Sequence, residues 1–276
     1  MNYRSDIDGL RALAVVPVML FHAGVPGFSG GYVGVDVFFV ISGFLITSMI
    51  AHEMRQGRFS IVTFYERRIR RILPASFAVL AFSSVAAWFI LTPADLKDYG
   101  QSVLASAAFS SNILFWLQTG YFDGPAHMKP LLHTWSLAVE EQFYIVYPLL
   151  LGVLIRYQRA RVTTWLVGLL VLSLGAAIWT TEHDASIAFY HSPLRGWELL
   201  LGCVLALGVV PPIASPRLRE TVAAAGLLLI ASPVVAYGEG TTFPGIGALA
   251  PCLGAGLIVH AGAGGRSSII GRTLSR

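Results

Sequence analysis

Residues Asp8–Ala23 read DGLRALAVVPVMLFHA and place one cation and one imidazole on an otherwise apolar stretch. In a helix, Arg11 and His22 lie about three turns apart, so both side chains point the same way with about 16 Å of helix between them. Ionisable groups on a membrane helix usually face a cavity or a partner. The competing interpretation places each group at one membrane interface, where lipid headgroups merely wet it.

The whole chain has the composition of a polytopic membrane protein. Of its 276 residues, 55% are hydrophobic and only 12% are charged, and the mean hydropathy is +0.68. Several stretches are long enough to cross a bilayer. We therefore expect an all-α transmembrane bundle of about eight spans plus one re-entrant or irregular segment. The arginines gather between apolar stretches, which suits the positive-inside rule, and no face is suited to nucleic acid.

Two arginine clusters orient the chain. Residues 53–71 carry six arginines against two glutamates, and Arg156, Arg159 and Arg161 form a later cluster. Both are expected in the cytoplasm, together with the N-terminus. If every apolar stretch crossed fully, the later cluster would lie outside, so we expect Gln101–Leu117, which is rich in serine, to be re-entrant or irregular. The other expected spans include Val33–Ala51, Leu73–Thr92, Val162–Thr180, Pro193–Val210, Thr221–Tyr237 and Ile246–Ala261.

The first cluster has two interpretations. Its arginines Arg67, Arg68, Arg70 and Arg71 can act as topogenic charges that contact anionic lipid. Alternatively, they can bind a phosphorylated donor, because guanidinium groups match the geometry of phosphate.

Asp36 enters the second apolar stretch within its first turn. A carboxylate at that position complements the N-terminus of a helix. Its predicted level in the membrane is also close to that of His22. An Asp36–His22 contact is the functional alternative, since a carboxylate would fix the tautomer of a general base.

A second group of polar residues lies at the head of another apolar run, where Leu132–Tyr144 read LHTWSLAVEEQFY. Two adjacent carboxylates are expensive to insert in a membrane unless they line a cavity. At helical spacing Ser136, Glu140 and Tyr144 share one face while Glu141 points away, so the two glutamates are expected to have different roles. His133 is either a loop residue or part of the site, and Trp135 is either an interfacial anchor or a platform for a sugar.

Arg195 and Glu198 stand three positions apart near the start of Pro193–Val210. They either satisfy each other as an ion pair or present a polar rim to the same cavity. Cys203 and Cys252 lie in apolar stretches without metal-ligand spacing, so we expect small buried side chains and neither a metal site nor a disulfide.

Several motifs, in order, resemble the acyltransferase 3 family of integral-membrane O-acyltransferases. They are Arg11 with His22, GGYVGVDVFFVISGFL at Gly30–Leu45, RRIRRILP at Arg67–Pro74, HTWSLAVEEQFY at His133–Tyr144 and RGWEL at Arg195–Leu199. The resemblance covers nearly the whole chain as one transmembrane acyltransferase domain, 1–276. Family members usually continue with about two more spans and some add a hydrolase-like domain, so a chain that stops at Arg276 is expected to lack the last spans.

The resemblance implies a multi-pass enzyme of the bacterial inner membrane. It would move an acyl group, most often acetyl, from cytoplasmic acyl-CoA to a hydroxyl of an extracytoplasmic glycan such as O-antigen, exopolysaccharide or peptidoglycan, or of a lipid-linked saccharide. Acyl-CoA would be a substrate, with no permanently bound cofactor, and membrane lipids would be the other partners.

Roles for individual residues follow from the resemblance and the chemistry together. Acyl-CoA is a polyanion, so Arg67, Arg68, Arg70 and Arg71 would hold its phosphates and Arg11 would guide the donor arm. His22 would deprotonate the acceptor hydroxyl or carry the acyl group briefly, with Asp36 or Glu141 as its orienting group and Glu140 as a further catalytic carboxylate. The acceptor would contact a set of polar and aromatic residues, namely His133, Trp135, Ser136, Tyr144, Arg195 and Glu198.

The rival class is a proton-coupled transporter or flippase of envelope precursors. Arg11, His22, Asp36, Glu140 and Glu141 would then form a proton relay. Inverted repeats with broken helices in matching halves are typical of that class, and the sequence shows no such symmetry.

Overall fold

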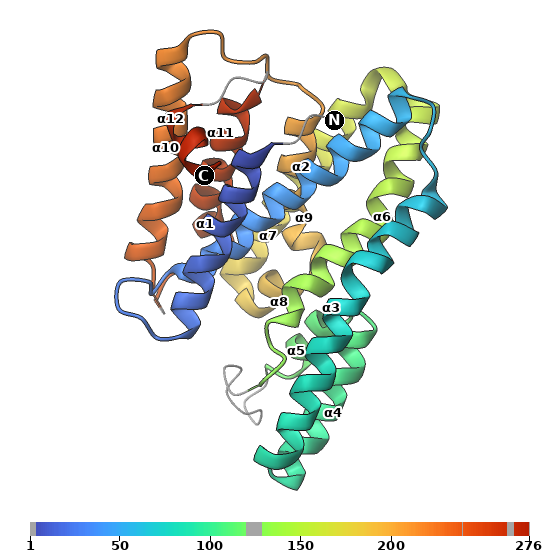
Figure 1. The fold of residues 1–276 in the computed structure, drawn as a ribbon, viewed down its shortest axis with the longest axis vertical. Coiled ribbons are helices and arrows are strands. Elements are labelled where there is room, and N and C mark those ends of the chain that lie inside the picture. Colours follow the sequence, from blue (N-terminus) through green and yellow to red (C-terminus); the bar gives the residue numbers. More distant parts are fainter. Residues whose placement is uncertain (1–3, 120–128, 239, 264–267, 276) are drawn as a thin grey trace. The chain divides into compact units, whose positions relative to one another are not determined.

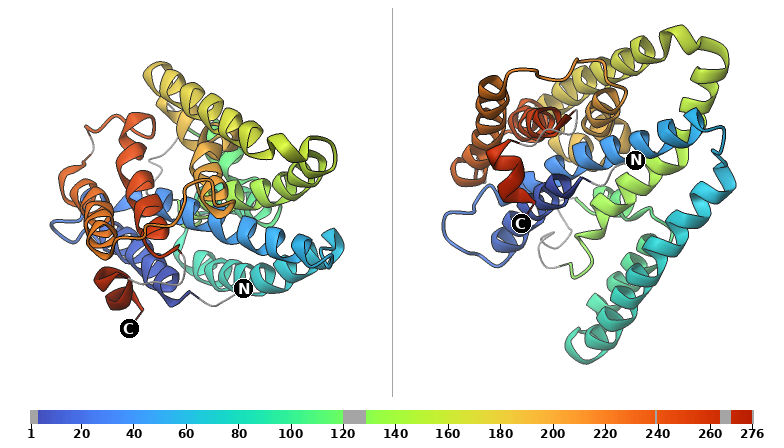
Figure 2. Two further views of the ribbon diagram at one scale, coloured as in Figure 1. Left: turned by 90° about the horizontal axis from the view of Figure 1, so that it is seen from above. Right: turned by 45° about the horizontal axis from the view of Figure 1, so that its top comes forward.

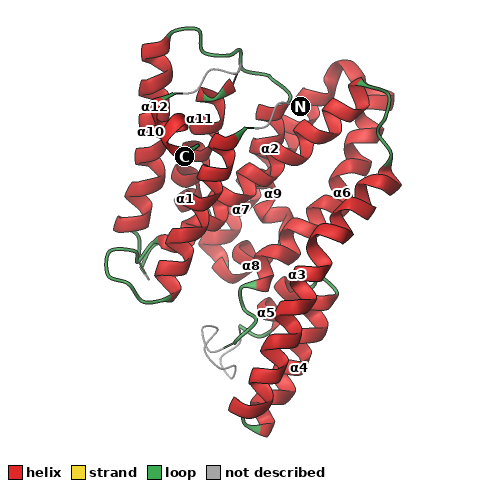
Figure 3. Ribbon diagram, in the orientation of Figure 1, coloured by secondary structure: helices red, strands yellow, loops and turns green. Residues whose placement is uncertain are grey.

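The computed structural model describes residues 4–119, 129–238, 240–263 and 268–275, and every regular element in these ranges is a helix (Figures 1 and 3). This confirms the predicted all-α fold. The chain forms two compact units. Unit 1 contains the residues up to His52, Val153–Phe189 and the chain from Pro193 onward, and unit 2 contains Glu53–Gly152 and Tyr190–Ser192.

Unit 1 is built from the two ends of the sequence and one central segment, Val153–Phe189. Its helices are α1 (Ser5–His22), most of α2 (Gly34–Arg55), α7 (Val162–His183), most of α8 (Ala185–Tyr190), α9 (Ser192–Ala206), α10 (Pro216–Ala236), α11 (Leu249–Ala261) and α12 (Ile269–Leu274). Short 3-10 turns at Gly31–Val33 and Ile246–Ala248 lead into α2 and α11. Unit 2 holds α3 (Ile61–Ile90), α4 (Pro93–Ala107), α5 (Ser111–Leu117) and most of α6 (Thr134–Gln158).

Five of the described helices are long and apolar enough to cross a membrane. They are Gly31–Arg55, Ile61–Ile90, Thr134–Gln158, Val162–His183 and Pro216–Ala236. The expected count of about eight spans is therefore not confirmed. Two of the expected spans fall short, because α9 has 15 residues and α11 has 13, or about 23 Å and 20 Å of helix against a hydrocarbon core of about 30 Å.

The Gln101–Leu117 segment, expected to be re-entrant or irregular, is interrupted near its middle. Helix α4 ends at Ala107, α5 begins at Ser111, and Phe109 between them has a φ of 51°. Polar side chains at the break are buried rather than exposed to lipid: the Ser106 hydroxyl lies 2.8 Å from that of Thr134 on α6. Irregular backbone at membrane depth needs such protein partners.

Glycines bring the helices of unit 1 into backbone contact. Helices α2 and α9 touch where a Cβ atom on Gly43 would lie 1.9 Å from the carbonyl oxygen of Leu199, and one on Gly202 would lie 2.0 Å from that of Val40. Small residues at helix interfaces allow this approach in membrane proteins. The contact fixes α2 against α9. It lies a short distance along these helices from Asp36 on α2 and from Arg195 and Glu198 on α9, which are described below.

Helices α10 and α11 pack side by side in the same way (Figures 1 and 2). A Cβ atom on Gly226 would lie 2.7 Å from the carbonyl oxygen of Gly254, and one on Gly254 would lie 2.6 Å from that of Gly226. The 3-10 turn Gly31–Val33, just before α2, also makes backbone contact with α1, because a Cβ atom on Gly31 would lie 2.2 Å from the carbonyl oxygen of Pro17. Unit 1 is thus assembled through close glycine contacts.

Replacing Gly43 with valine should separate α2 from α9, because the new side chain would overlap the Leu199 backbone. We expect the Gly43→Val protein to lose about 3 kcal/mol or more of unfolding free energy. Gly175 on α7 has open space around its Cα, so Gly175→Val is the matched control and should stay within about 1 kcal/mol of the wild type. Thermal unfolding in detergent measures both, and equal losses would contradict the proposed contact.

Candidate functional site

A fully buried ion cluster lies in unit 1. Asp36 comes from the first turn of α2, and Arg195 and Glu198 come from consecutive turns of α9. The Arg195 Nη2 atom donates to Asp36 Oδ1 at 2.5 Å, and Arg195 Nε lies 2.9 Å from Glu198 Oε1. The three side chains are at most 1% exposed. Burial at this depth is tolerable only because the charges pair with one another.

Aromatic rings surround the Arg195 guanidinium. Its Cζ atom lies 5.6 Å, 5.7 Å and 5.6 Å from the ring centroids of Phe39, Phe189 and Phe243, respectively. Ring faces attract a cation, so they add to the stabilisation that the two carboxylates supply. The rings also keep water away from the ion pairs.

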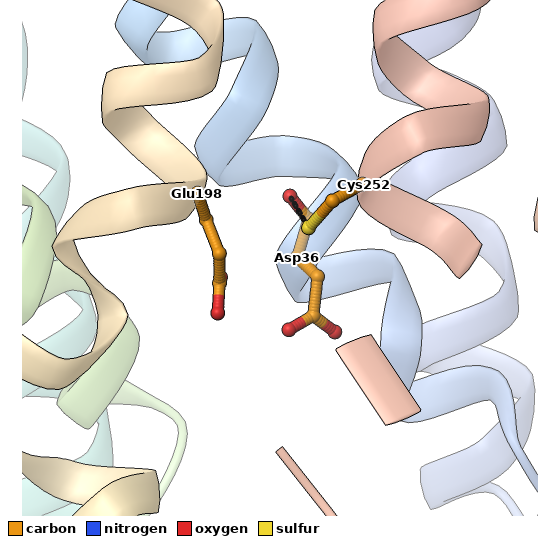
Figure 4. A group of neighbouring side chains, drawn as sticks. All are labelled: Asp36, Glu198 and Cys252. Atoms are coloured by element: carbon orange, nitrogen blue, oxygen red, sulfur yellow. Dashed lines mark hydrogen bonds between the residues drawn. The ribbon is translucent and has the colours of Figure 1, made fainter. Parts of the chain in front are cut away.

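Cys252 of α11 completes a group whose possible ligand atoms lie within 4.8 Å of one another. Figure 4 shows Asp36, Glu198 and Cys252 arriving from α2, α9 and α11, and the Cys252 thiol lies 3.9 Å from the Asp36 carbonyl oxygen. Two carboxylates and a thiol are chemically able to hold a metal ion. Here the Arg195 guanidinium already lies between the carboxylates, so an arginine supplies the cation.

The ion cluster selects between alternatives that the sequence left open for Asp36, Arg195 and Glu198. Arg195 and Glu198 form the ion pair and do not present a polar rim to an acceptor, because both are fully enclosed. Asp36 pairs with Arg195 rather than with His22, whose described hydrogen bond goes to Val18. The aspartate–imidazole contact is therefore not found.

His22 is exposed at the last residue of α1. Its Nδ1 atom lies 2.8 Å from the carbonyl oxygen of Val18, one turn earlier on the same helix. A carbonyl can only accept, so Nδ1 carries the proton and Nε2 of the neutral ring keeps its lone pair. The ring also packs edge-on against Phe21, with centroids 5.1 Å apart. The backbone thus fixes a tautomer whose outer nitrogen is a base.

Arg11 is held at the other end of α1. Its Nη1 atom lies 3.6 Å from Asp8, and its Cζ atom lies 5.7 Å from the ring centroid of Phe38 on α2. The side chain is about one-third exposed. It is therefore positioned by neighbours and still accessible.

The second polar group lies in unit 2, where the two glutamates of α6 have different surroundings. The Tyr144 hydroxyl donates to Glu140 one turn before it. Glu141 is 8% exposed, and no described residue hydrogen-bonds to its buried Oε1 atom. Arg68 of α3 places its Cζ atom 4.6 Å from the ring centroid of Tyr144 and 5.8 Å from that of Phe64.

The four arginines of the Arg67–Arg71 cluster have different environments. Arg67 pairs with Glu53 at 2.7 Å and Arg70 pairs with Glu66 at 2.7 Å, both on the surface. Arg68 stacks on aromatic rings. Arg71 is exposed and has no ion pair or hydrogen bond with any residue that the structure describes. Only some of these guanidinium groups are therefore available to a ligand.

The predicted acceptor residues at the start of α6 are divided between surface and interior. His133 is exposed, and its carbonyl accepts a hydrogen bond from Ser136 Oγ at 3.2 Å. Trp135 is 8% exposed and meets Tyr190 edge-on, with centroids 5.8 Å apart. Burial raises the pKa of the Tyr190 hydroxyl, so this phenol stays neutral. The indole of Trp135 packs like a core residue in this arrangement.

A buried amide network in unit 2 was not singled out from the sequence. Gln142 Nε2 donates to the Phe109 carbonyl and to Asn112 Oδ1, both at 2.9 Å, and Asn112 Nδ2 donates to the Tyr190 carbonyl at 2.9 Å. Ser192 also donates to Gln142. Asparagine and glutamine in apolar stretches were the available signal, and the network they form closes the break between α4 and α5.

Removing the Arg195 guanidinium should leave two buried carboxylates without a cation. We expect Arg195→Leu to lower the unfolding free energy by about 3 to 5 kcal/mol. Adding Asp36→Asn and Glu198→Gln to that variant should restore much of the loss, since the neutral side chains no longer need the cation. The exposed pair offers a control, because Arg70→Leu should cost under about 1 kcal/mol. Undiminished stability of Arg195→Leu in a detergent unfolding assay would refute this role.

Comparison with known proteins identifies the family. The family model of the acyltransferase domain, Acyl_transf_3, matches residues 4–276. No solved structure is significantly similar to the chain.

Several curated proteins are similar in sequence. The chain is 38% identical over 214 residues to the putative peptidoglycan O-acetyltransferase YrhL of Bacillus subtilis. The aligned region covers 75% of this chain and 33% of that protein. It is 36% identical over 219 residues to the O-acetyltransferase OatA of Staphylococcus aureus, and this region covers 77% of the present chain and 36% of OatA. The peptidoglycan O-acetyltransferase OatA of Listeria monocytogenes is 35% identical over 214 residues, covering 74% and 34%.

The matched region is about one-third of each of these relatives. The family model nevertheless covers nearly all of the present sequence, including each of the motifs quoted above. On this evidence, the chain belongs to the acyltransferase 3 family.

Proposed function

We propose that the chain is an O-acetyltransferase of the bacterial inner membrane, with a cytoplasmic N-terminus. It transfers the acetyl group of acetyl-CoA to a hydroxyl of an extracytoplasmic glycan, with peptidoglycan as the first candidate acceptor. Support comes from the family and from the activities for which the relatives in Bacillus, Staphylococcus and Listeria are named. Five candidate membrane spans agree with a membrane location.

The observation that carries the mechanism is the hydrogen bond from His22 Nδ1 to the Val18 carbonyl. It leaves Nε2 as the basic nitrogen on an exposed ring, which is what a general base for a hydroxyl requires. In direct transfer, Nε2 takes the proton of the acceptor hydroxyl while the hydroxyl oxygen attacks the carbonyl carbon of the thioester. The carbon–sulfur bond then breaks, and the imidazolium returns the proton to the departing thiolate.

The same geometry changes the role of Asp36. A carboxylate is not needed to fix the tautomer, because the Val18 carbonyl does so. Asp36 instead pairs with Arg195 and ties α2 to α9. Asp36, Arg195 and Glu198 thus support the unit that carries His22.

Arginines supply the contacts to the donor phosphates. Arg71 is exposed and is not engaged by any residue that the structure describes, so its guanidinium can bind phosphate without breaking an ion pair. Arg67 and Arg70 would have to exchange a glutamate for the ligand. Arg11, one-third exposed beside Phe38, remains the proposed guide for the donor arm. Charge-assisted contacts of this kind are strong for phosphate.

The acceptor is proposed to meet the start of α6, where His133 just before the helix is exposed and Ser136 is partly exposed. Tyr144 and Glu140 lie deeper on the same helix and are hydrogen-bonded to each other. Trp135 can act as a sugar platform only after it leaves its edge-on contact with Tyr190.

The test of this function is glycan-dependent release of CoA from acetyl-CoA by the purified protein in lipid. We expect His22→Ala to reduce the rate by at least about 100-fold, because the base is lost. His183 is a matched control: it is also exposed at the end of a helix, with Nδ1 2.7 Å from the carbonyl oxygen of Trp179 one turn earlier. His183→Ala should retain the wild-type rate. Equal rates for His22→Ala and the wild type would overturn the assignment.

The donor contact is tested separately. We expect Arg71→Gln to raise the KM for acetyl-CoA about tenfold, because one charged contact to phosphate is lost. The KM for S-acetylpantetheine, which lacks the phosphates, should not change. Arg217, exposed at the start of α10, provides the control substitution Arg217→Gln. An identical KM for acetyl-CoA in the Arg71→Gln and wild-type proteins would exclude Arg71 from the donor site.

A further inference from the structure

We infer that Arg68 and Glu141 in unit 2 bind one secondary amide of the pantetheine arm of the donor. The amide carbonyl would accept from the Arg68 guanidinium, and the amide N–H would donate to the Glu141 carboxylate. This inference rests on the proposed function, since it requires a CoA thioester as the donor. It assigns Glu141 to donor binding rather than to orientation of His22.

Glu141 is a buried acceptor that the protein leaves unused. The residue is 8% exposed, and its Oε1 atom has no hydrogen-bond partner among the described residues. A buried acceptor without a donor loses the free energy of its hydration. Its neighbour Glu140 differs, because it accepts from Tyr144. Of these two neighbouring glutamates, Glu141 is therefore the one with a buried carboxyl oxygen that no described residue hydrogen-bonds.

Arg68 is the complementary donor. Aromatic rings of Phe64 and Tyr144 hold its guanidinium, as described above. Within the described part of the chain, no ion pair or hydrogen bond engages Arg68, although Arg67 and Arg70 beside it each pair with a glutamate. The guanidinium is thus fixed in position with N–H groups still available.

Arg68 and Glu141 lie near each other without forming an ion pair. The Arg68 guanidinium packs on the ring of Tyr144, three residues after Glu141 on α6, yet no direct ion pair joins Arg68 and Glu141 in the described structure. Their helices face each other in unit 2, since the Tyr65 hydroxyl of α3 donates to the Ile145 carbonyl of α6 at 2.7 Å. A donor on one helix and an acceptor on the facing helix match a trans amide, whose C=O and N–H point in opposite directions.

The surroundings favour pantetheine over a sugar hydroxyl. Arg67, Arg70 and Arg71 are exposed within one turn of Arg68, where they can meet phosphates. In CoA the pantetheine arm is neutral, carries two amides and connects the phosphates to the thioester. Arg68 is half-buried and Glu141 is buried, which suits the neutral arm, whereas the exposed arginines suit the phosphates.

The experiment measures binding of pantetheine, which lacks the nucleotide and its phosphates, to the purified full chain in lipid nanodiscs. Glu141→Leu removes the acceptor and should weaken binding about tenfold, the effect of one buried hydrogen bond. Glu141→Gln keeps an acceptor oxygen and should bind within about threefold of the wild type. Arg68→Leu should also weaken binding about tenfold. The exposed Glu66 gives the matched control, and Glu66→Leu should bind pantetheine as the wild type does.

These binding measurements test the role of Arg68 and Glu141 separately from the proposed acetyltransferase function. Wild-type affinity in Glu141→Leu, or no pantetheine binding by the wild type, would overturn it. Loss of binding in Glu141→Gln equal to that in Glu141→Leu would also overturn it, because the charge and not the acceptor would then matter. Acetyl transfer to glycan by the wild type is assayed in parallel. If that transfer occurs while pantetheine affinity ignores Glu141, the proposed function stands and only this inference fails.

Discussion

The ion cluster of Asp36, Arg195 and Glu198 is the constraint on which unit 1 depends. Three charges at most 1% exposed can persist only while they hold one another. Their contact fixes the start of α2 against α9, and the glycine contact between Gly43 and Leu199 lets the two helices come close enough for it to form. The turn before α2 in turn packs against α1 near Pro17, five residues before His22. The exposed imidazole therefore sits on a helix that the buried cluster helps to position.

Much of the local structure could be predicted from the sequence, because it depends on neighbours along the chain. The all-helical class followed from hydropathy, and the expectation of a re-entrant or irregular Gln101–Leu117 followed partly from its polar residues. Helical spacing gave the Arg195–Glu198 ion pair as one of two alternatives and placed Glu140 and Tyr144 on one face. Longer-range contacts could not be predicted. Asp36 and Arg195 are 159 positions apart, and both alternatives for Asp36 were consistent with its place in a first turn. The expected count of about eight spans is not confirmed, and hydropathy alone did not show that α9 and α11 are short helices.

The candidate site shows the same division. Arginine spacing identified a cluster but could not show that Arg67 and Arg70 are engaged by glutamates while Arg68 is stacked on rings. Likewise, the sequence does not reveal which ring nitrogen of His22 carries the proton, whereas the hydrogen bond to the Val18 carbonyl assigns it to Nδ1. In both units the polar groups that pair with one another maintain the fold. Catalysis or ligand binding is assigned to groups that keep an atom available to a ligand, namely His22 in unit 1 and Arg68 with Glu141 in unit 2.

The most direct test of the account follows the acetyl group itself. The purified protein, in lipid vesicles, is given acetyl-CoA labelled in its acetyl group together with peptidoglycan fragments, and the glycan is analysed by mass spectrometry before and after mild base. If the protein is an O-acetyltransferase, the glycan should carry labelled acetyl that mild base removes, as expected of an O-ester. Label found only in acetyl-CoA or free acetate, with a glycan of unchanged mass, would contradict this function.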